Sequence, residues 1–334
     1  MNYKNTLFIN FGGIGDEILF LPALRTFKAD YPESKITLAL ENRSKSIKNL
    51  TDLINETICV DIKAKGIKKY INILDFIFNV RKKKFDCVIS SGKSPFIAII
   101  LYLSGIKERI GYSSRTDFLL TKKVPLNENQ YAGKMYHNLV EPITKTEYQN
   151  PKINIPESYN LPDELLQKEF ISIHPGVSKM SLSKNIFKCP KIDFWIELIK
   201  GLLKKGKNVV LLGTQDDEDL INQILKNKEI KEHPNFINFF NRTKDIMEMA
   251  LIMQKSTNVI CVDSAPLHVA VSVGCNIFAI FGPTNDEKLI PKSNKINLIT
   301  NNCNCRPCLW HKRQNNCEAS ECLNIDPNLI LEEL

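Results

Sequence analysis

Residues 263–266 (DSAP) lie between a predicted strand and a predicted helix, at a position where the backbone can bind an anion. They follow the apolar run 259–262, which is typical of a buried parallel strand, and they precede a segment that has helical features and stops at Gly274. Ser264 can cap that helix, and Pro266 falls in its first turn, where a missing N–H costs little. A helix start beside the carboxyl end of a strand points free N–H groups and the helix dipole at a ligand. The pattern predicts an anion site, although an ordinary buried strand–helix–strand unit fits the same residues.

Asp16 is a second residue with chemical potential, and it follows a glycine-rich turn. Residues 7–11 predict a strand, and three of the four positions from 12 to 15 are glycine. Glycines allow the backbone to approach a ligand closely. An acidic side chain at a helix start is also favoured as a cap, so a structural role for Asp16 stays open. The turn is not a dinucleotide-binding fingerprint, because Ile18 occupies the place of its third glycine.

The elements that position these residues form two similar halves. The chain has 334 residues, and a hydrophobic share of 43% can bury two cores. Prolines recur between positions 142 and 162, so we expect a linker there and two domains, 1–160 and 161–334. The strand predicted at 170–173 leads into the turn 174–176 (HPG), which repeats the plan of the first half. Alternating strands and helices predict an α/β fold.

The charge and the apolar segments limit the partners and the location. The net charge is +8, with 45 Lys and Arg against 37 Asp and Glu, which favours anionic partners such as nucleotides or phosphorylated lipids. No nucleic-acid-binding motif accompanies this charge, so we expect no nucleic acid partner. The N-terminal residues lack the layout of a signal peptide, and residues 95–103 are about half as long as a bilayer span. We expect a cytoplasmic protein that can make peripheral contact with the inner membrane.

Residues 65–84 combine apolar and basic side chains. At helical spacing Asn72, Asp75 and Asn79 form one narrow polar stripe, and the rest of the central segment is an apolar arc. This favours a helix packed in the first domain. The alternative is a helix at a membrane surface, with lysines meeting anionic head groups.

Several motifs resemble those of glycosyltransferase family 9, the bacterial lipopolysaccharide heptosyltransferases. Residues 263–268 (DSAPLH), followed by residues 281–284 (FGPT), resemble the donor-site signature of that family. Gly15-Asp16 with residues 21–25 (LPALR) resembles its N-terminal motif, and the HPG turn occurs in family order. The resemblance covers nearly the whole chain. It implies a GT-B fold, in which two Rossmann-like parallel-sheet domains face a cleft, the first for the acceptor and the second for the nucleotide sugar.

The reaction implied by the resemblance is an inverting transfer of heptose from an ADP-sugar to the lipid A-linked inner core of lipopolysaccharide. Asp16 would be the general base on the acceptor hydroxyl, and the helix start after Asp263 would stabilise the departing diphosphate. No cofactor is expected for catalysis. Three alternatives stay open: another nucleotide sugar, a protein or surface-glycan acceptor, and a non-catalytic nucleotide-binding regulator on the same scaffold.

The resemblance also assigns residues to the two substrates. The expected donor-binding residues are His174, Lys188, Gln215, Asp263, Ser264, Ala265, Pro266, His268 and Gly282. The expected acceptor-binding residues are Gly13, Gly15, Arg109 and Arg115. The family lysine that contacts the donor phosphates falls on Phe187, so Lys188 or Lys184 would have to replace it. For the two histidines, bracing of the loops is the alternative to contact with the donor.

Two groups of residues raise the question of a metal. The acidic run 216–219 (DDED) could suggest a metal site, but acidic residues gather in the first turn of a helix because its dipole favours them. Five of the ten cysteines lie between positions 303 and 322, where metal binding explains the crowding better than disulfides. The expected ligands of a structural zinc or iron are Cys305, Cys308, Cys317 and Cys322, with thiol burial or pairing as the alternative.

Overall fold

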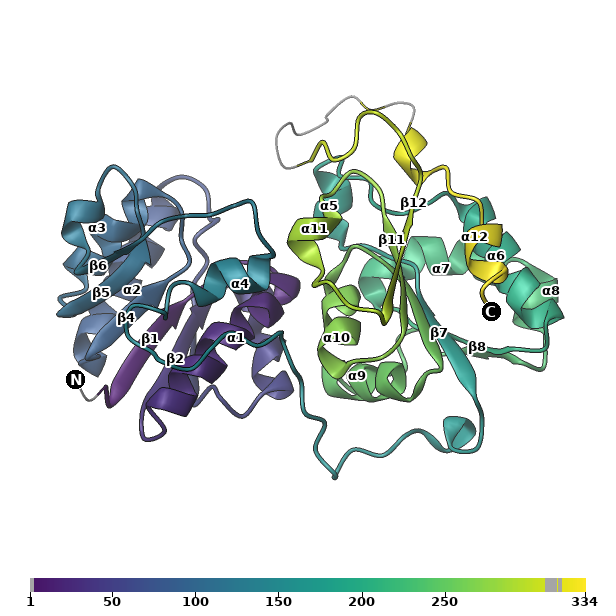
Figure 1. The fold of residues 1–334 in the computed structure, drawn as a ribbon, viewed down its shortest axis with the longest axis horizontal. Coiled ribbons are helices and arrows are strands. Elements are labelled where there is room, and N and C mark those ends of the chain that lie inside the picture. The colour runs from purple at the N-terminus through teal and green to yellow at the C-terminus, as the bar shows by residue number, and fades with distance from the viewer. Residues whose placement is uncertain (1–2, 310–316, 318–319) are drawn as a thin grey trace. The chain divides into compact units, whose positions relative to one another are not determined.

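The computed structural model describes residues 3–309, 317 and 320–334 (Figure 1). The chain forms two compact units, Met1–Ile153 and Asn154–Leu334, so the division comes earlier than the expected boundary after residue 160. Within the described residues, no helix is both long enough and apolar enough to cross a bilayer.

The first unit contains a six-stranded sheet in the order β3-β2-β1-β4-β5-β6, with every neighbouring pair parallel. Its strands are β1 (Asn5–Ile9), β2 (Lys35–Leu40), β3 (Glu56–Cys59), β4 (Cys87–Ser90), β5 (Glu108–Tyr112) and β6 (Lys122–Val124). Its helices are α1 (Ile14–Asp30), α2 (Ile67–Lys83), α3 (Pro95–Leu103) and α4 (Ala132–His137), with the 3-10 turns η1 (Asn42–Leu50) and η2 (Asp117–Leu119).

Alternation along β1 explains how this sheet is covered on both faces. Leu7 and Ile9 join the apolar cluster that contains the buried side chains of α2 and α3. Phe8 points to the other face, where its ring meets the rings of Phe20 and Phe27 of α1. Because successive side chains of a strand point to opposite faces, α1 lies on one face and α2 with α3 on the other.

The second unit contains a six-stranded parallel sheet in the order β12-β11-β10-β7-β8-β9. Its strands are β7 (Phe170–His174), β8 (Asn208–Leu211), β9 (Phe236–Asn238), β10 (Asn258–Val262), β11 (Ile277–Phe281) and β12 (Ile296–Thr300). Its helices are α5 (Lys179–Ser183), α6 (Ile192–Lys204), α7 (Glu218–Leu225), α8 (Lys228–Lys231), α9 (Ile246–Lys255), α10 (Ala265–Val273), α11 (Asp286–Leu289) and α12 (Asn328–Leu331). The 3-10 turns are η3 (Asp163–Leu165), η4 (Gln215–Asp217) and η5 (Glu321–Leu323).

Parallel pairing brings the carboxyl ends of all strands in a unit to one edge of its sheet. The order of strands reverses beside β1 in the first unit and beside β7 in the second, and ligands of open α/β sheets bind at such points. Asp16 follows β1, His174 ends β7, and Asp263 follows β10, the neighbour of β7. The predicted α/β fold with two parallel sheets is confirmed, and it places each of these residues at a carboxyl edge.

Candidate functional site

A buried ion pair lies at the end of β10 in the second unit. The Lys188 Nζ atom is 3.0 Å from Asp263 Oδ2 and 3.2 Å from the Asp263 carbonyl oxygen. Asp263 is only 2% exposed. Burial raises the pKa of this carboxyl, but the opposing effect of the charges of Lys188 and His268 is larger. The pKa of Asp263 therefore lies below the usual value. The carboxylate is therefore charged at neutral pH, and it holds the lysine beside the start of α10.

The start of α10 is open toward solvent. Ser264 occupies the N-cap position but makes no capping hydrogen bond, because its hydroxyl donates to the Val262 carbonyl at 3.3 Å. Ser264, Ala265 and Pro266 are all partly exposed. Ser264 therefore occupies the N-cap position as expected, but the expected capping hydrogen bond from its side chain is absent. First-turn N–H groups that no side chain caps are what an anion requires.

His174 and Asp217 form a second buried contact at the same edge, where β7 ends. His174 Nε2 is 3.7 Å from Asp217 Oδ2, and burial lowers the pKa of the imidazole despite this carboxylate. Asp217 Oδ2 accepts hydrogen bonds from the Thr214 backbone N–H at 2.8 Å and from its hydroxyl at 3.2 Å. Asp217 thus caps a helix start, as the dipole interpretation of the acidic run predicts. Gly176 is required beside it, since a Cβ there would lie 1.8 Å from Asp217 Oδ1.

Three further donor candidates surround these contacts. His268 is buried on α10, one turn after the open helix start. Gln215 is exposed in η4 after β8, and its side-chain oxygen accepts a hydrogen bond from Asn241 Nδ2 at 3.2 Å. Gly282 follows β11, and a Cβ there would lie 2.4 Å from Leu323 Cδ2. Most of the donor candidates, from five segments of the chain, therefore lie at the carboxyl edge of one sheet.

The C-terminal segment braces the turn that contains Gly282. Arg306 Nε donates to the Gly282 carbonyl at 2.6 Å, and Arg306 Nη2 pairs with Asp286 at 2.8 Å. The Cys308 backbone N–H donates to the Pro283 carbonyl at 3.0 Å. The tail therefore holds the turn after β11, which sequence reasoning assigned to donor recognition alone.

The thiols of this tail are the expected ligands of a structural metal. Cys303 and Cys305 place their Sγ atoms 3.4 Å apart, and burial together with the other thiols raises the pKa of Cys322 to about 12. Across residues 3–309, 317 and 320–334, no group of three or more Cys, His, Asp or Glu could hold a metal ion. The expected ligand set of Cys305, Cys308, Cys317 and Cys322 is thus not found as a group in this part of the chain, and a structural metal there stays a prediction.

Asp16 lies at the corresponding edge of the first unit. Its Oδ2 accepts the Gly13 backbone N–H at 2.8 Å, which is the capping role, and the Tyr136 hydroxyl also hydrogen-bonds this carboxylate. Asp16 remains partly exposed. Gly12 leaves room for it, since a Cβ there would lie 2.2 Å from the Asp16 Cβ. Two donors thus fix the carboxylate while it stays accessible, so capping and proton transfer are compatible.

Two neighbours of Asp16 were missed by sequence reasoning. Glu17 is buried, and burial followed by the charge of Asp16 raises its pKa well above the usual value. Arg43 extends toward the glycine turn, with Nη1 3.3 Å from where a Cβ of Gly13 would stand. Its Nε pairs with Glu41 at 2.7 Å. The signal for Arg43 was its place just after the strand that ends at Leu40, at the same edge as Asp16.

The two arginines assigned to the acceptor lie at different edges of the sheet. Arg109 is near the beginning of β5, and its guanidinium donates to the carbonyls of Leu119 (2.7 Å) and Ile106 (2.6 Å). Arg115 comes after the end of β5 and is exposed. Since Asp16 follows the end of β1, only Arg115 shares its edge. An acceptor role for Arg109 does not fit this placement, and its hydrogen bonds indicate a bracing role instead.

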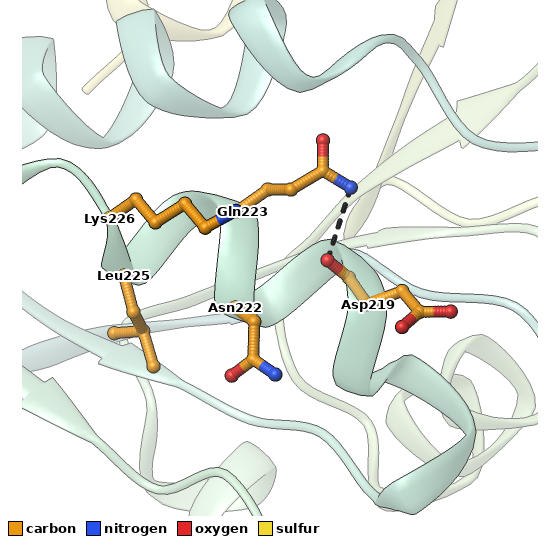
Figure 2. A pocket seen from close by; sticks show the side chains of 5 residues that line it. All are labelled: Asp219, Asn222, Gln223, Leu225 and Lys226. Carbon is orange, nitrogen blue, oxygen red and sulfur yellow. Dashed lines mark hydrogen bonds between the residues drawn. The ribbon is translucent and has the colours of Figure 1, made fainter.

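A shallow surface pocket lies apart from these residues, on α7 (Figure 2). It is lined by Asp219, Asn222, Gln223, Leu225 and Lys226. The lining side chains come from a single helix and its C-cap, and Gln223 Nε2 donates to the Asp219 carbonyl of the same helix at 3.1 Å. We assign no ligand to this pocket.

Replacing Lys188 with methionine should destabilise the second unit. We expect the free energy of unfolding at pH 7 to fall by about 2–3 kcal/mol, because Asp263 would keep a buried charge without its partner. The native pKa of Asp263 lies below its unfolded value, so its contribution is present above the ordinary carboxyl pKa and is lost as the pH falls through the native value. The difference in the free energy of unfolding between variant and wild type should therefore become smaller on acidification. Urea unfolding at pH 7 and pH 4 measures it.

The matched control is Lys184→Met, since Lys184 is an exposed lysine of the same segment. It should unfold as the wild type does at both pH values. A Lys188→Met protein with wild-type stability at pH 7, or a gap that widens on acidification, would contradict the role given to the ion pair.

Comparison with known proteins adds independent evidence. A family model described as glycosyltransferase family 9 (heptosyltransferase) matches residues 73–319. Lipopolysaccharide heptosyltransferase 2 of Salmonella typhimurium is 25% identical over 355 residues, which cover 96% of this chain and 94% of that protein. Lipopolysaccharide heptosyltransferase 3 of Escherichia coli is 24% identical over 287 residues, which cover 81% of this chain and 80% of that protein.

A solved structure supports the fold. The ADP-heptose lipopolysaccharide heptosyltransferase II of Escherichia coli superposes with a TM-score of 0.75 at 20% identity, covering 98% of this chain and 97% of that one. This likeness shows the GT-B fold that the motifs implied. Because the family model spans most of the sequence, the chain belongs to glycosyltransferase family 9 (heptosyltransferase), and it is a glycosyltransferase.

Proposed function

We propose that this enzyme transfers a heptose from ADP-heptose to the inner core of lipopolysaccharide, with inversion at the anomeric carbon. The names of the relatives support the sugar and the acceptor, since they are lipopolysaccharide heptosyltransferases. The observation that carries the proposal is the open start of α10 with the Lys188–Asp263 pair beside it. This is a site for a diphosphate, built from amides, a helix dipole and one fixed ammonium group.

The donor would bind at the carboxyl edge of the second unit. The first-turn amides at Ser264 and Ala265, with Lys188, would hold the diphosphate and stabilise its charge as it leaves. Lys188 would therefore replace the family lysine at Phe187, because it lies beside Asp263 at this edge, whereas Lys184 is exposed. The remaining donor contacts would come from His174, Gln215, Pro266, His268 and Gly282.

We propose that no metal is needed for this step. The leaving diphosphate requires compensation of negative charge, and the ammonium group of Lys188 with the α10 amides supplies it. His174 is held neutral by burial, so it would contribute hydrogen bonding or bracing and not charge.

The acceptor would bind at the carboxyl edge of the first unit. Asp16 would take the proton from the acceptor hydroxyl as this oxygen attacks the anomeric carbon. The backbone at Gly13 and Gly15 would allow close approach, and Arg115 would pair with anionic groups of the acceptor. Arg43, which adjoins Gly13, is a further cation for the same purpose. In this scheme the unit Met1–Ile153 serves the acceptor and the unit Asn154–Leu334 the donor, and the enzyme works in the cytoplasm.

A panel of nucleotide sugars, with transfer and hydrolysis read by mass spectrometry, tests the donor. We expect turnover with ADP-heptose and little with UDP- or GDP-linked hexoses. Preferred turnover of another nucleotide sugar would replace the donor while keeping the fold and family. Transfer to a protein or to a surface glycan, with none to inner-core lipopolysaccharide, would replace the acceptor. Activity that a chelator abolishes and magnesium restores would overturn the metal-free step.

Asp16→Asn should remove most of the turnover while leaving the fold and donor binding intact. The amide keeps the shape of the side chain but cannot accept the proton, and loss of a general base typically lowers the rate about a hundredfold or more. The measurements are kcat with ADP-heptose and calorimetric binding of ADP. Near wild-type kcat from a folded Asp16→Asn enzyme would remove the base role from Asp16.

Arg115→Glu should raise the apparent KM for the acceptor about tenfold or more, because a carboxylate would repel the anionic groups that the arginine pairs with. The affinity for ADP should stay unchanged. Lys107→Glu is the control, since it makes the same charge reversal at the opposite edge of the sheet. Loss of ADP binding with an unchanged acceptor KM would reassign Arg115.

A further inference from the structure

Helix α2 has two apolar stripes, and only one of them is buried. The buried stripe packs into the core of the first unit through Ile73, Phe76, Ile77 and Val80. The members of the other stripe are between 57% and 78% exposed: Ile67, Tyr70, Ile71, Leu74 and Phe78. Residues three, four and seven apart share one side of a helix, so the exposed stripe is continuous. The helix packs in its unit as expected, but half of its apolar arc faces away from the core.

Helix α3 and the turn η2 extend this surface. α2 and α3 cover the same face of the sheet, since their buried side chains belong to one cluster (Figure 1). Arg81 Nε of α2 donates to the Leu103 carbonyl of α3 at 2.8 Å, which joins the ends of the two helices. We name the exposed apolar surface the α2–α3 face, and it comprises Ile67, Tyr70, Ile71, Leu74, Phe78, Phe96, Tyr102, Leu103 and Phe118.

Basic residues stand at both ends of α2. Segment 65–84 contains seven Lys and Arg residues and a single acidic residue, Asp75. The basic residues are Lys65, Lys68 and Lys69 at the beginning and Arg81, Lys82, Lys83 and Lys84 at the end, and all are exposed. The Lys82 ammonium lies 4.4 Å from the ring centroid of Phe78, so charge and apolar surface adjoin directly. Soluble proteins rarely expose so large an apolar surface unless something binds to it.

We propose that the α2–α3 face binds the surface of a membrane that contains anionic lipid. The apolar side chains would enter the boundary between head groups and acyl chains by ~5–10 Å, while the lysines remain among the phosphates. Charge decides between the possible occupants. The centres of protein–protein interfaces are depleted in lysine, whereas each lysine near an anionic bilayer adds attraction.

The position of this face also bears on the proposed reaction. α3 begins just after β4 ends, and Phe118 follows β5, so the α2–α3 face reaches the sheet edge that carries Asp16. A lipid-linked acceptor would then arrive at the base from the bilayer to which the enzyme is bound. This consequence rests on the proposed function, whereas the binding of lipid does not.

Flotation of the full chain with lipid vesicles tests the proposal without any sugar substrate. We expect binding to vesicles in which about a quarter of the phosphatidylcholine is replaced by phosphatidylglycerol, and weaker binding at high salt. Leu74→Ser with Phe78→Ser should lower the partition coefficient about tenfold or more. Lys68→Gln with Lys69→Gln should lower it about tenfold on anionic vesicles alone.

Matched controls come from exposed residues of the second unit. Leu166→Ser with Leu329→Ser removes apolar side chains that are 58% and 47% exposed, and Lys226→Gln with Lys228→Gln removes two exposed lysines. Both pairs should bind vesicles as the wild type does. The proposal fails if the wild type floats with neither vesicle or if the α2 variants bind unchanged. A third outcome would also contradict it. Light scattering would show that the wild type is a dimer and that the double variant Leu74→Ser with Phe78→Ser is a monomer, and flotation would show no binding to vesicles.

Discussion

The second unit depends on the attraction between the Lys188 ammonium and the buried carboxylate of Asp263. The Asp263 carboxylate needs this partner, since a lone charge in so deeply buried a position is strongly unfavourable. Together they fix the end of β10, the loop before α6 and the start of α10 relative to one another. The pair thus organises the loops at one sheet edge and leaves a cation beside free amides. A single interaction therefore stabilises the fold and places an ammonium group beside a helix start that no side chain caps.

A second constraint is the parallel order of both sheets. It collects the loops that follow each strand at one edge, so residues far apart in sequence become neighbours without any long-range motif. Glycines then decide how closely those loops approach. Gly12 makes room for Asp16, and Gly176 makes room for Asp217, in the same way in two different units. The repeated plan of strand, glycine turn and helix is therefore a packing solution as well as a functional one.

The sequence predicted the α/β fold and the strand–helix–strand unit around Asp263, because buried parallel strands leave short apolar runs and helix starts leave Ser, Asp and Pro. It could not predict which lysine lies beside Asp263, since that depends on the path of the loop after β7. It misplaced Arg109, because the sequence alone does not show whether an arginine near a strand lies at the amino or the carboxyl edge of the sheet. For α2, periodicity revealed a wide apolar arc, but only packing against β1 and α3 shows which half of it is buried. Glu17 left no signal, since its burial follows from the packing of α1 and not from its neighbours in the chain.

The contacts of Arg306 with the turn after β11 affect the order in which the two units can fold during synthesis. The turn after β11 is held by residues that come later in the chain, through the bonds of Arg306 to Gly282 and Asp286 and the packing of Leu323 on Gly282. The first unit has all its strands and helices long before synthesis ends, so it can fold while the second is still emerging. The second unit can complete this turn only after the segment that contains Arg306 and Leu323 has been synthesised. The first unit can therefore fold before the second, whose sheet edge is completed by its own later residues.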